Sequence, residues 1–265
     1  MQFWGLCYNY AETFKHNKVG VMEEPKNVKS ERRPSCVRLK PRLQMLAHLV
    51  RPGVKVADIG SDHALLPIYL IQNGISPSVL ATDVNRGPLE NARANAKAHG
   101  VGSALQTRLS DGLAEVQAHE AEDIIIAGTG GELIAKIISA APWLCDENKR
   151  LILQPMSRPE VLRAFLYRAG FWPLREEACF EGRRVYIAMQ TAYKSGEKKA
   201  CDAAYKYVGL LHLNKNAAAK EHLNRQLQSL QKKADALKKT NSEQAELSEL
   251  EDIIKAIKAV LQNKV

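Results

Sequence analysis

Short apolar segments alternate with helical stretches through the middle of the chain. Strands are predicted at 54–59, 79–82, 104–109, 123–127 and 150–153, and helices at 64–73, 89–99, 132–140 and 159–169. A closing pair of strands is predicted at 172–177 and 185–191, with Gly182 in the turn between them. Strands that alternate with helices of about ten residues build a parallel sheet with helices on both faces. The pattern therefore predicts an α/β fold, in which ligands bind at the carboxyl ends of the strands.

Length and composition exclude several classes of protein. At 265 residues, 45% hydrophobic and 25% charged, the chain suits one full domain plus a smaller part, and not a disordered protein. No apolar run approaches the ~20 residues that span a bilayer, and Met1–Tyr10 lacks the basic start of a secretion signal. The five cysteines lie far apart without a Cys-x-x-Cys pair, which indicates neither a disulfide framework nor a zinc site. We therefore expect a cytoplasmic protein with no membrane segment and no metal.

The net charge of +9 is concentrated at the two ends of the chain. Residues 1–57 carry a net charge of +7, residues 58–192 carry −3, and residues 193–265 carry +5. Basic ends around a near-neutral middle suit a ligand with a phosphate backbone, because each neutralised phosphate releases counterions. Solvated lysines that keep the protein soluble explain the same charges equally well. The charge alone leaves a nucleic-acid partner open.

Residues 194–265 have a different pattern. Apolar residues recur at spacings of three and four in two runs: Leu223, Leu227, Leu230, Ala234 and Leu237, then Leu247, Leu250, Ile254, Ile257 and Leu261. In the polar link between the runs, Thr240 and Glu243 have the spacing of a capping box. The pattern predicts an antiparallel helical hairpin with coiled-coil packing. Its basic residues are each typical of a solvated face, but together they favour an arm that binds a partner: Lys215, Lys220, Arg225, Lys232, Lys233, Lys238 and Lys239.

Acidic residues stand at the ends of three successive predicted strands, at Asp58, Asp83 and Asp111. A dinucleotide-binding turn would need a glycine where Asp62 stands, because the backbone must approach a pyrophosphate. S-adenosylmethionine has no phosphate but carries a sulfonium and an ammonium group, which the carboxylates of Asp58 and Asp62 would attract. Asp83 is placed to bond both ribose hydroxyls, and Asp111-Gly112 to bond the adenine amino group. The aspartates could instead cap helices, and that interpretation stays open.

Four short motifs coincide with these strand ends. They are Asp-Ile-Gly-Ser-Asp-His-Ala-Leu-Leu-Pro at 58–67, Ala-Thr-Asp-Val-Asn at 81–85, Ser-Asp-Gly-Leu at 110–113 and Ala-Gly-Thr-Gly-Gly at 127–131. Together they resemble the bacterial tRNA (adenine-N1)-methyltransferases that modify adenosine 22 in the D-arm. The resemblance runs from about Leu39 to the C-terminus and implies a Rossmann-like class I methyltransferase sheet followed by the helical hairpin. Thr129 is a departure, since the family has methionine between the glycines.

The resemblance also implies roles for individual residues. S-adenosylmethionine would be bound by Asp58, Gly60, Asp62, Asp83, Val84, Asn85, Asp111, Gly112, Leu113 and Gly128. The substrate tRNA would contact Arg42, Thr129, Gly130, Gly131, Lys232 and Lys233. Asp62 and His63 are the expected catalytic residues, because a nearby carboxylate would stabilise the cation that methylation at N1 leaves on adenine. For His63 a structural role, bonding the backbone or Asp62, is an equal alternative.

The turn at 128–131 favours a ring nitrogen as the nucleophile. Enzymes that methylate exocyclic amino groups usually carry an Asn/Asp-Pro-Pro-aromatic turn after the fourth strand. Here the turn offers no side-chain acceptor except the hydroxyl of Thr129. Adenine N1 is held in pairing or stacking within folded tRNA, so the base must be extruded into the pocket.

Three segments are predicted from these observations. Residues 1–36 match nothing in the family pattern and are expected to be a flexible basic extension, 37–193 the methyltransferase domain, and 194–265 the tRNA-binding arm of a monomer. Two alternatives stay open. A methyltransferase of proteins or small molecules would keep the cofactor residues but would not need the basic arm. A non-catalytic RNA-binding protein on this scaffold would bind tRNA and not S-adenosylmethionine.

Overall fold

The computed structural model describes residues 36–196, 201–213, 216–240 and 244–262. Its helices are α1 (Pro41–Leu49), α2 (Leu65–Gln72), α3 (Arg86–Ala98), α4 (Gly131–Ser139), α5 (Pro159–Ala169), α6 (Ala203–Val208), α7 (Ala217–Thr240) and α8 (Gln244–Gln262). Its strands are β1 (Val56–Ile59), β2 (Val79–Asp83), β3 (Leu105–Leu109), β4 (Asp123–Gly130), β5 (Arg150–Ser157), β6 (Phe171–Glu181) and β7 (Arg184–Tyr193). Short 3-10 helices lie at Ala118–Glu120, Pro142–Leu144 and Leu211–Leu213. Apart from Cys36, the predicted basic extension lies outside the described residues.

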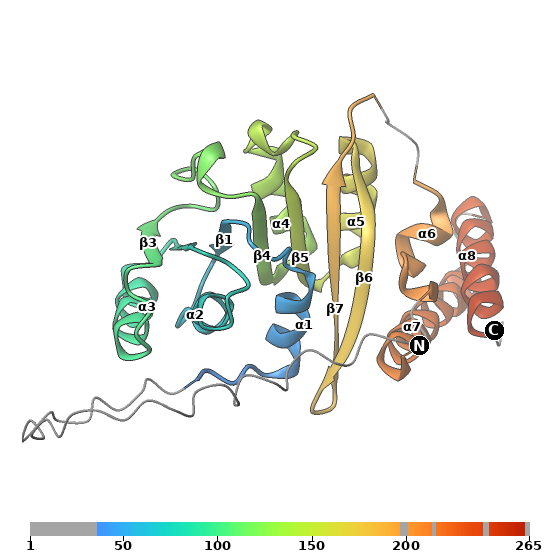
Figure 1. The fold of residues 1–265 in the computed structure, drawn as a ribbon. Helices are drawn as coiled ribbons and strands as arrows, with labels where there is room; N and C mark the ends of the chain where they lie inside the picture. The colour runs from blue at the N-terminus through green and yellow to red at the C-terminus, as the bar shows by residue number, and fades with distance from the viewer. Residues whose placement is uncertain (1–35, 197–200, 214–215, 241–243, 263–265) are drawn as a thin grey trace, which may run out of the picture. The chain divides into compact units, whose positions relative to one another are not determined.

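These strands form one sheet in the order β3-β2-β1-β4-β5-β7-β6 (Figure 1). Strands β1 to β5 run parallel to one another, whereas β7 is antiparallel to both β5 and β6. In register, Val56 of β1 lies opposite Val79 of β2 and Asp123 of β4. The order therefore reverses at β1, where the chain has wound first to one edge of the sheet and then to the other.

Helices cover both faces of the sheet, as predicted. Ile124 and Ile126 of β4 lie in a buried cluster with residues of α4 and α5. Ile125, between them in sequence, points to the opposite face and packs in a cluster with Leu46 of α1 and Leu66 of α2. Because successive strand residues point to opposite faces, a strand covered on both sides must be apolar throughout. The predicted fold class is thereby confirmed.

Several predicted elements are too short. The strands predicted at 123–127 and 150–153 continue to Gly130 and Ser157, because their ends pair irregularly across glycine and proline residues. The closing strands are the middle of the longer β6–β7 ribbon, which turns at Gly182 with φ of 60°. The helix predicted at 89–99 begins at Arg86, and Pro88 falls within its first turn. Helix α6 has no counterpart among the predicted elements.

The C-terminal helices α7 and α8 pack against each other through the apolar positions that the spacing predicts. Leu223, Leu230, Leu250 and Ile257 are all buried in this cluster, to which α6 also contributes. Their pairing is confirmed, and its coiled-coil character stays a prediction. The predicted capping box requires Glu243, which lies outside the described residues. None of the helices that the structure describes is long and apolar enough to cross a membrane.

A buried ion pair joins the sheet to α6. Arg163 of α5 and Glu176 of β6 are each 1% exposed, and hydrogen bonds of 3.0 and 2.8 Å join guanidinium and carboxylate. Nη1 of Arg163 also donates to the carbonyl oxygens of Lys206 and Tyr207 at the end of α6. Gly209 follows with φ of 56°, and a Cβ there would collide with both members of the ion pair. The ion pair and this glycine together fix where the C-terminal helices leave the sheet.

We expect Gly209→Ala to lower the free energy of unfolding by at least about 3 kcal/mol, because the new methyl group must displace a buried ion pair. Gly182→Ala is the matched control: its φ is also positive, but a Cβ there meets nothing within 4 Å. Gly182→Ala should lower the free energy of unfolding by only ~1–2 kcal/mol, the cost of placing a residue with a Cβ in the left-handed backbone conformation. Urea unfolding followed by circular dichroism measures both. Equal losses would show that the ion pair does not constrain Gly209.

Candidate active site

Most of the predicted site residues lie at or follow the carboxyl ends of the parallel strands; the exceptions are Arg42 in α1 and Lys232 and Lys233 in α7. The carboxyl ends of β1 and β4 are neighbours, and the strand order reverses between them (Figure 1). A crevice at such a reversal is where open α/β sheets bind ligands. The turn after β1 and the turn at the end of β4 therefore form the two sides of the candidate site.

The turn after β1 has an unusual backbone. Gly60 has φ of 76°, and His63 and Ala64 have φ of 61° and 52° without being glycine. Such conformations cost roughly 1–3 kcal/mol each and persist only where neighbours impose them. Here the amides of Gly60 and Ser61 both donate to the carbonyl oxygen of Thr82, and the carbonyl oxygen of His63 accepts from the Asn95 side chain at 2.9 Å. The strained turn is thus fixed by β2 and α3.

Asp58 is the buried carboxylate of the site, with 7% of the residue exposed. Burial raises its pKa from 3.8 to about 6, and Ser61 and the positive charge of Arg42 oppose that shift. The Ser61 hydroxyl lies near the Asp58 carboxylate, but the two do not reach hydrogen-bonding distance, and the hydroxyl has no other partner among the described residues. Because the raised pKa reflects a carboxylate that is poorly solvated, the folded state loses stability as pH rises through about 4–6. A cationic ligand beside Asp58 would favour its ionised form.

The end of β2 presents a carboxylate to solvent. Oδ1 of Asp83 accepts from the backbone amide of Asn85 at 2.8 Å, which orients the side chain at the strand end. Val84 is 62% exposed although it is apolar. An oriented carboxylate beside an exposed apolar side chain suits a ligand that has both hydroxyl groups and a flat ring. Asp83, Val84 and Asn85, the three predicted cofactor-binding residues at this strand end, therefore have the arrangement that such a ligand requires.

The turn after β3 is compact. The Ser110 hydroxyl donates to the carbonyl oxygen of Gly112 and accepts from the amide of Glu115. Gly112 has φ of 57°, and a Cβ there would lie 3.1 Å from Ile137. Asp111 is exposed, whereas Leu113 is buried and belongs to the core. Of the predicted residues in this turn, Asp111 is thus the one whose side chain is free to reach a ligand.

The turn at the end of β4 is tied to α1 by a buried glutamine. Oε1 of Gln154, in β5, accepts from Nη1 of Arg42 at 3.0 Å and from the amide of Gly128 at 3.2 Å. Arg42 also lies over the Tyr186 ring, 5.7 Å from its centre, and its backbone amide donates to Glu181. The guanidinium of Arg42 is consequently held beside Gly128, as a residue facing the substrate would be.

The other glycines of that turn have packing roles. A Cβ on Gly130 would lie 3.2 Å from the Ser157 hydroxyl, and one on Gly131 would collide with the carbonyl oxygen of Arg158. Gly131 is buried, and Thr129 is partly exposed. The structure therefore explains Gly131 by the close approach of α4 to the end of β5, and its contact with substrate stays a prediction.

Asp62 and His63, the predicted catalytic pair, lie side by side in the turn between β1 and α2. Nε2 of His63 is 3.3 Å from Oδ1 of Asp62, and their side chains are 53% and 69% exposed respectively. An exposed pair of this kind adds little stability. Both side chains are consequently available to a bound molecule.

Lys232 and Lys233 are not close to these residues in the fold. They belong to α7, which packs against β6 and β7 at the opposite edge of the sheet from β3 (Figure 1). Lys233 forms a 2.7 Å ion pair with Glu246 of α8. Any contact of these lysines with a ligand must therefore involve one large enough to extend from the site to α7.

Sequence reasoning missed Gln154, Glu181 and Tyr186. Gln154 is fully buried in β5. In the sequence it is a polar residue that directly follows the apolar run Leu151–Leu153, and this is the signal that could have identified it. Glu181 and Tyr186 offered no such signal, because their contacts with Arg42 join positions far apart in the sequence. Within the described residues, no group of three or more His, Cys, Asp or Glu side chains could hold a metal ion.

A family model for a methyltransferase domain matches residues 39–189 of the chain. The tRNA (adenine(22)-N(1))-methyltransferase of Bacillus subtilis is 30% identical over 239 residues, which are 86% of this chain and 98% of that protein. The chain belongs to this methyltransferase family. The family predicted from the four motifs is confirmed.

Solved structures extend the likeness beyond the sheet. The tRNA methyltransferase TrmK of Bacillus subtilis matches this methyltransferase with a TM-score of 0.75 at 30% identity, over 85% of this chain and 99% of that one. A Streptococcus pneumoniae protein in complex with S-adenosyl-L-methionine matches with a TM-score of 0.68 at 33% identity, over 84% and 100% of the two chains. Coverage this high includes the C-terminal helices as well as residues 39–189.

We expect Gln154→Met in this methyltransferase to lower the free energy of unfolding by about 1–3 kcal/mol. Methionine keeps the volume but leaves the Arg42 guanidinium and the Gly128 amide without their acceptor. Gln106→Met, at an exposed position of β3, is the control and should be nearly neutral. Urea unfolding compares the two, and a neutral Gln154→Met would mean that water replaces the lost acceptor.

Proposed function

We propose that this chain transfers a methyl group from S-adenosylmethionine to N1 of adenine in tRNA, at adenosine 22. The observation that carries the proposal is the match with the Bacillus subtilis enzyme over 98% of that enzyme's length. A chain that shared only the cofactor-binding sheet would leave the substrate open. This one also shares the C-terminal helices.

The cofactor's charged and polar groups fit the acids along the edge of the sheet. Asp58 and Asp62 attract the sulfonium and ammonium groups, the oriented carboxylate of Asp83 accepts from the ribose hydroxyls, and Asp111 accepts from the adenine amino group. Val84 covers one face of the adenine ring. The remaining proposed contacts are backbone or turn contacts at Gly60, Asn85, Gly112, Leu113 and Gly128. These assignments explain why carboxylates follow three successive strands.

The reaction is an in-line displacement. The lone pair of adenine N1 attacks the methyl carbon while the carbon–sulfur bond breaks, so the sulfonium becomes a neutral thioether and the positive charge passes to the adenine ring. The protein gains rate mainly by holding nucleophile and methyl in line, ~3–3.5 Å apart. The turn containing Thr129 and Gly130 forms one wall for the extruded base, and Arg42 stands beside it.

Asp62 and His63 act on the charge that the transfer creates. The carboxylate of Asp62 stabilises the methylated adenine cation electrostatically, and His63 positions that carboxylate. Both side chains are more than half exposed, so a base extruded from tRNA can reach them. We further propose that the enzyme is a cytoplasmic monomer, with one chain supplying every cofactor contact.

The direct test incubates the purified chain with unmodified tRNA transcripts and labelled S-adenosylmethionine, then identifies the nucleosides by mass spectrometry. We expect 1-methyladenosine, which is absent when a transcript carries guanosine in place of adenosine 22. Labelled protein or small molecules without a labelled nucleoside would overturn the RNA substrate. Binding of tRNA without cofactor binding would instead indicate a non-catalytic RNA-binding protein.

Asp58 predicts a distinctive dependence of cofactor affinity on pH. Since its pKa in the folded protein is about 6, affinity for S-adenosylmethionine should weaken below pH 6 by up to about tenfold per pH unit. Asp58→Asn should bind weakly at every pH, without that dependence. The same change should raise the free energy of unfolding at pH 7.5 by at most about 3 kcal/mol, because it removes a poorly solvated charge.

Calorimetric titrations between pH 5 and 8 measure this dependence. Asp83→Ala is the matched control: it should weaken cofactor binding at every pH and keep the dependence of the parent protein, with tRNA affinity nearly unchanged. A parent protein whose cofactor affinity is flat across this range would show that Asp58 does not face the cofactor's charges.

A further inference from the structure

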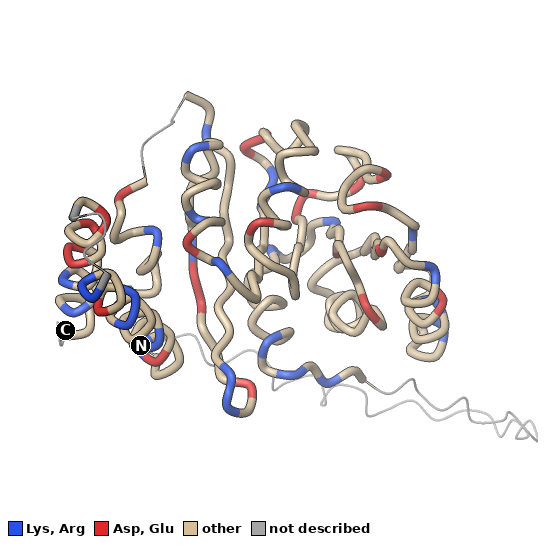
Figure 2. The backbone as a smooth tube through the Cα atoms, turned by 180° about the vertical axis from the view of Figure 1, so that it is seen from behind, with Lys and Arg blue, Asp and Glu red and all other residues tan. Residues whose placement is uncertain are grey.

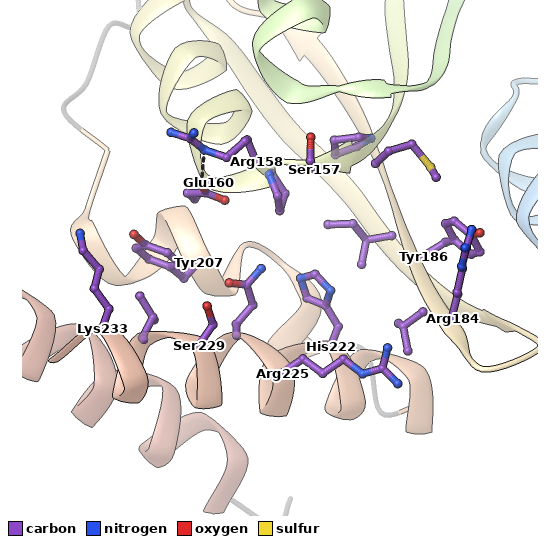
Figure 3. A pocket seen from close by; sticks show the side chains of 17 residues that line it. Ser157, Arg158, Glu160, Arg184, Tyr186, Tyr207, His222, Arg225, Ser229 and Lys233 are labelled. Atoms are coloured by element: carbon purple, nitrogen blue, oxygen red, sulfur yellow. Dashed lines mark hydrogen bonds and ion pairs between the residues drawn. The ribbon is translucent and has the colours of Figure 1, made fainter. Parts of the chain in front are cut away.

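A cleft of about 730 Å³ lies between the end of β5, the start of α5, β7 and helix α7 (Figure 3). Ser157 and Arg158 line its upper side in the figure, and residues of α7, among them His222 and Arg225, line its lower side. This volume is within the range of sites that hold small molecules or single nucleotides. None of the predicted site residues except Lys233 belongs to it.

The cleft adjoins the candidate active site. Ser157 pairs with Gly130 in the sheet register, so the same strand end borders both the Gly128–Gly131 turn and the cleft. Tyr186 lines the cleft and carries Arg42 over its ring. A polymer whose reacting unit lay against the Gly128–Gly131 turn would therefore have its neighbouring unit near the entrance of the cleft.

Cations dominate the rim. Arg158, Arg184, Arg225 and Lys233 line the cleft, and Glu160 is its one acidic lining residue. Arg158 pairs with Glu160 and Glu132, and Lys233 pairs with Glu246, so Arg184 and Arg225 are the cations considered below. Arg184 stands at the β6–β7 turn, where Figure 2 shows charged residues clustered at the tip, and no carboxylate pairs with it among the described residues. Arg225 pairs with Glu221, but in that pair the side chains are 50% and 38% exposed. Exposed pairs are weak and easily exchanged for a phosphate.

The floor of the cleft is aromatic and uncharged. Tyr186, Tyr207 and His222 all line it, and the pKa of His222 is lowered to about 4 by burial and by the nearby Arg163 and Arg225. His222 is therefore neutral at physiological pH. Its Nε2 is buried and has no hydrogen-bond partner in the described part of the chain, so His222 offers the cleft an uncharged ring and no hydrogen bond from this atom.

We propose that this cleft binds a nucleotide of the tRNA that flanks the methylated adenosine, with its base against Tyr207 and His222 and its phosphates on Arg184 and Arg225. The inference rests on the proposed function and adds to it a specific second contact. A cationic rim around a neutral aromatic floor matches a nucleotide, whose charge is on the phosphate and whose base is flat and neutral. An acidic peptide would need the cations but would leave the aromatic floor unexplained.

The first test measures tRNA binding by Arg184→Gln and Arg225→Gln at several salt concentrations. Each substitution should weaken tRNA binding about three- to tenfold and reduce the slope of log K against log salt by about 1, because one phosphate contact is lost. Lys97→Gln is the control, since this exposed residue belongs to α3, over the other edge of the sheet. Affinity for S-adenosylmethionine should stay at the parent value in all three. The melting temperature should stay at the parent value for Arg184→Gln and Lys97→Gln, and it is measured alongside for Arg225→Gln, which also loses its bond to the Arg183 carbonyl oxygen.

The second test compares Tyr207→Phe with Tyr207→Leu. Phenylalanine keeps a stacking face and should retain the parent affinity for tRNA, whereas leucine should weaken it about tenfold at an unchanged salt slope. Because Tyr207 also packs against the C-terminal helices, the melting temperature of each variant is measured alongside. Equal affinities for phenylalanine and leucine would exclude a stacked base at this position.

The outcomes separate the two levels of the proposal. If the parent chain forms 1-methyladenosine and the arginine variants bind tRNA with unchanged affinity and salt slope, the cleft is not an RNA site and this inference is wrong. If the parent chain neither binds nor methylates tRNA, the proposed function fails and the inference fails with it. If tRNA affinity falls only in the Arg184→Gln, Arg225→Gln and Tyr207→Leu variants, and their cofactor affinity equals that of the parent, the result supports both the proposed function and the cleft as an RNA site.

Discussion

The parallel pairing of β1 with β4 is the constraint on which the candidate site depends. Asp58 lies opposite Ile125 and Ile59 opposite Ile126, so the turns that follow the two strands end at the same edge of the sheet. Chain order does not bring these turns together, because two other strands and two helices lie between them in sequence. A slip of one residue in this register would exchange the residues of β4 that face α4 and α5 with the one that faces α1 and α2, and it would separate Asp58 from the Gly128 turn. Selection for a packed core therefore also preserves the geometry of the site.

The buried carboxylate of Asp58 lowers the stability of the folded protein at neutral pH. This carboxylate forms no ion pair with the residues that the structure describes. Arg42 acts on it only through its charge, and burial raises its pKa to about 6. Above that pH the free protein carries an ionised group that water would solvate better. In the proposed site, a sulfonium or ammonium group beside Asp58 would remove this penalty on binding, so the burial of Asp58 would add to the affinity for the cofactor. The strained backbone of His63 and Ala64, held by Asn95 and Thr82, is a second cost located in the same turn.

The sequence predicts the elements that are stabilised locally and misses those that depend on distant contacts. Buried strands such as Ile124–Ile126 and the helix Pro159–Ala169 are evident from apolar runs, proline and glycine alone. Helix α6 is too short to be stable by itself and exists because Arg163 bonds its last carbonyl groups and α8 packs against it. In the site, the acids at strand ends follow from pattern, whereas Gln154 gains its role from Arg42, 112 residues away, and from Gly128, 26 residues away. No local pattern encodes such a bridge.

The same long-range contacts link the two sides of the cleft. Helix α5 begins beside Arg158 at the rim, and one turn later its Arg163 forms the ion pair that fixes the end of α6. The C-terminal helices are further joined to the ribbon by bonds from Asn216 to Ala178 and from Arg225 to Arg183. Nη2 of Arg225 donates to the Arg183 carbonyl oxygen, so the side chain that lines the cleft also joins α7 to the β6–β7 ribbon. The ion pair does not line the cleft, but its Arg163 bonds the end of α6, which carries Tyr207 of the cleft. For a substrate as large and rigid as tRNA, a cleft of fixed width can discriminate by shape where the chemistry of single contacts is general.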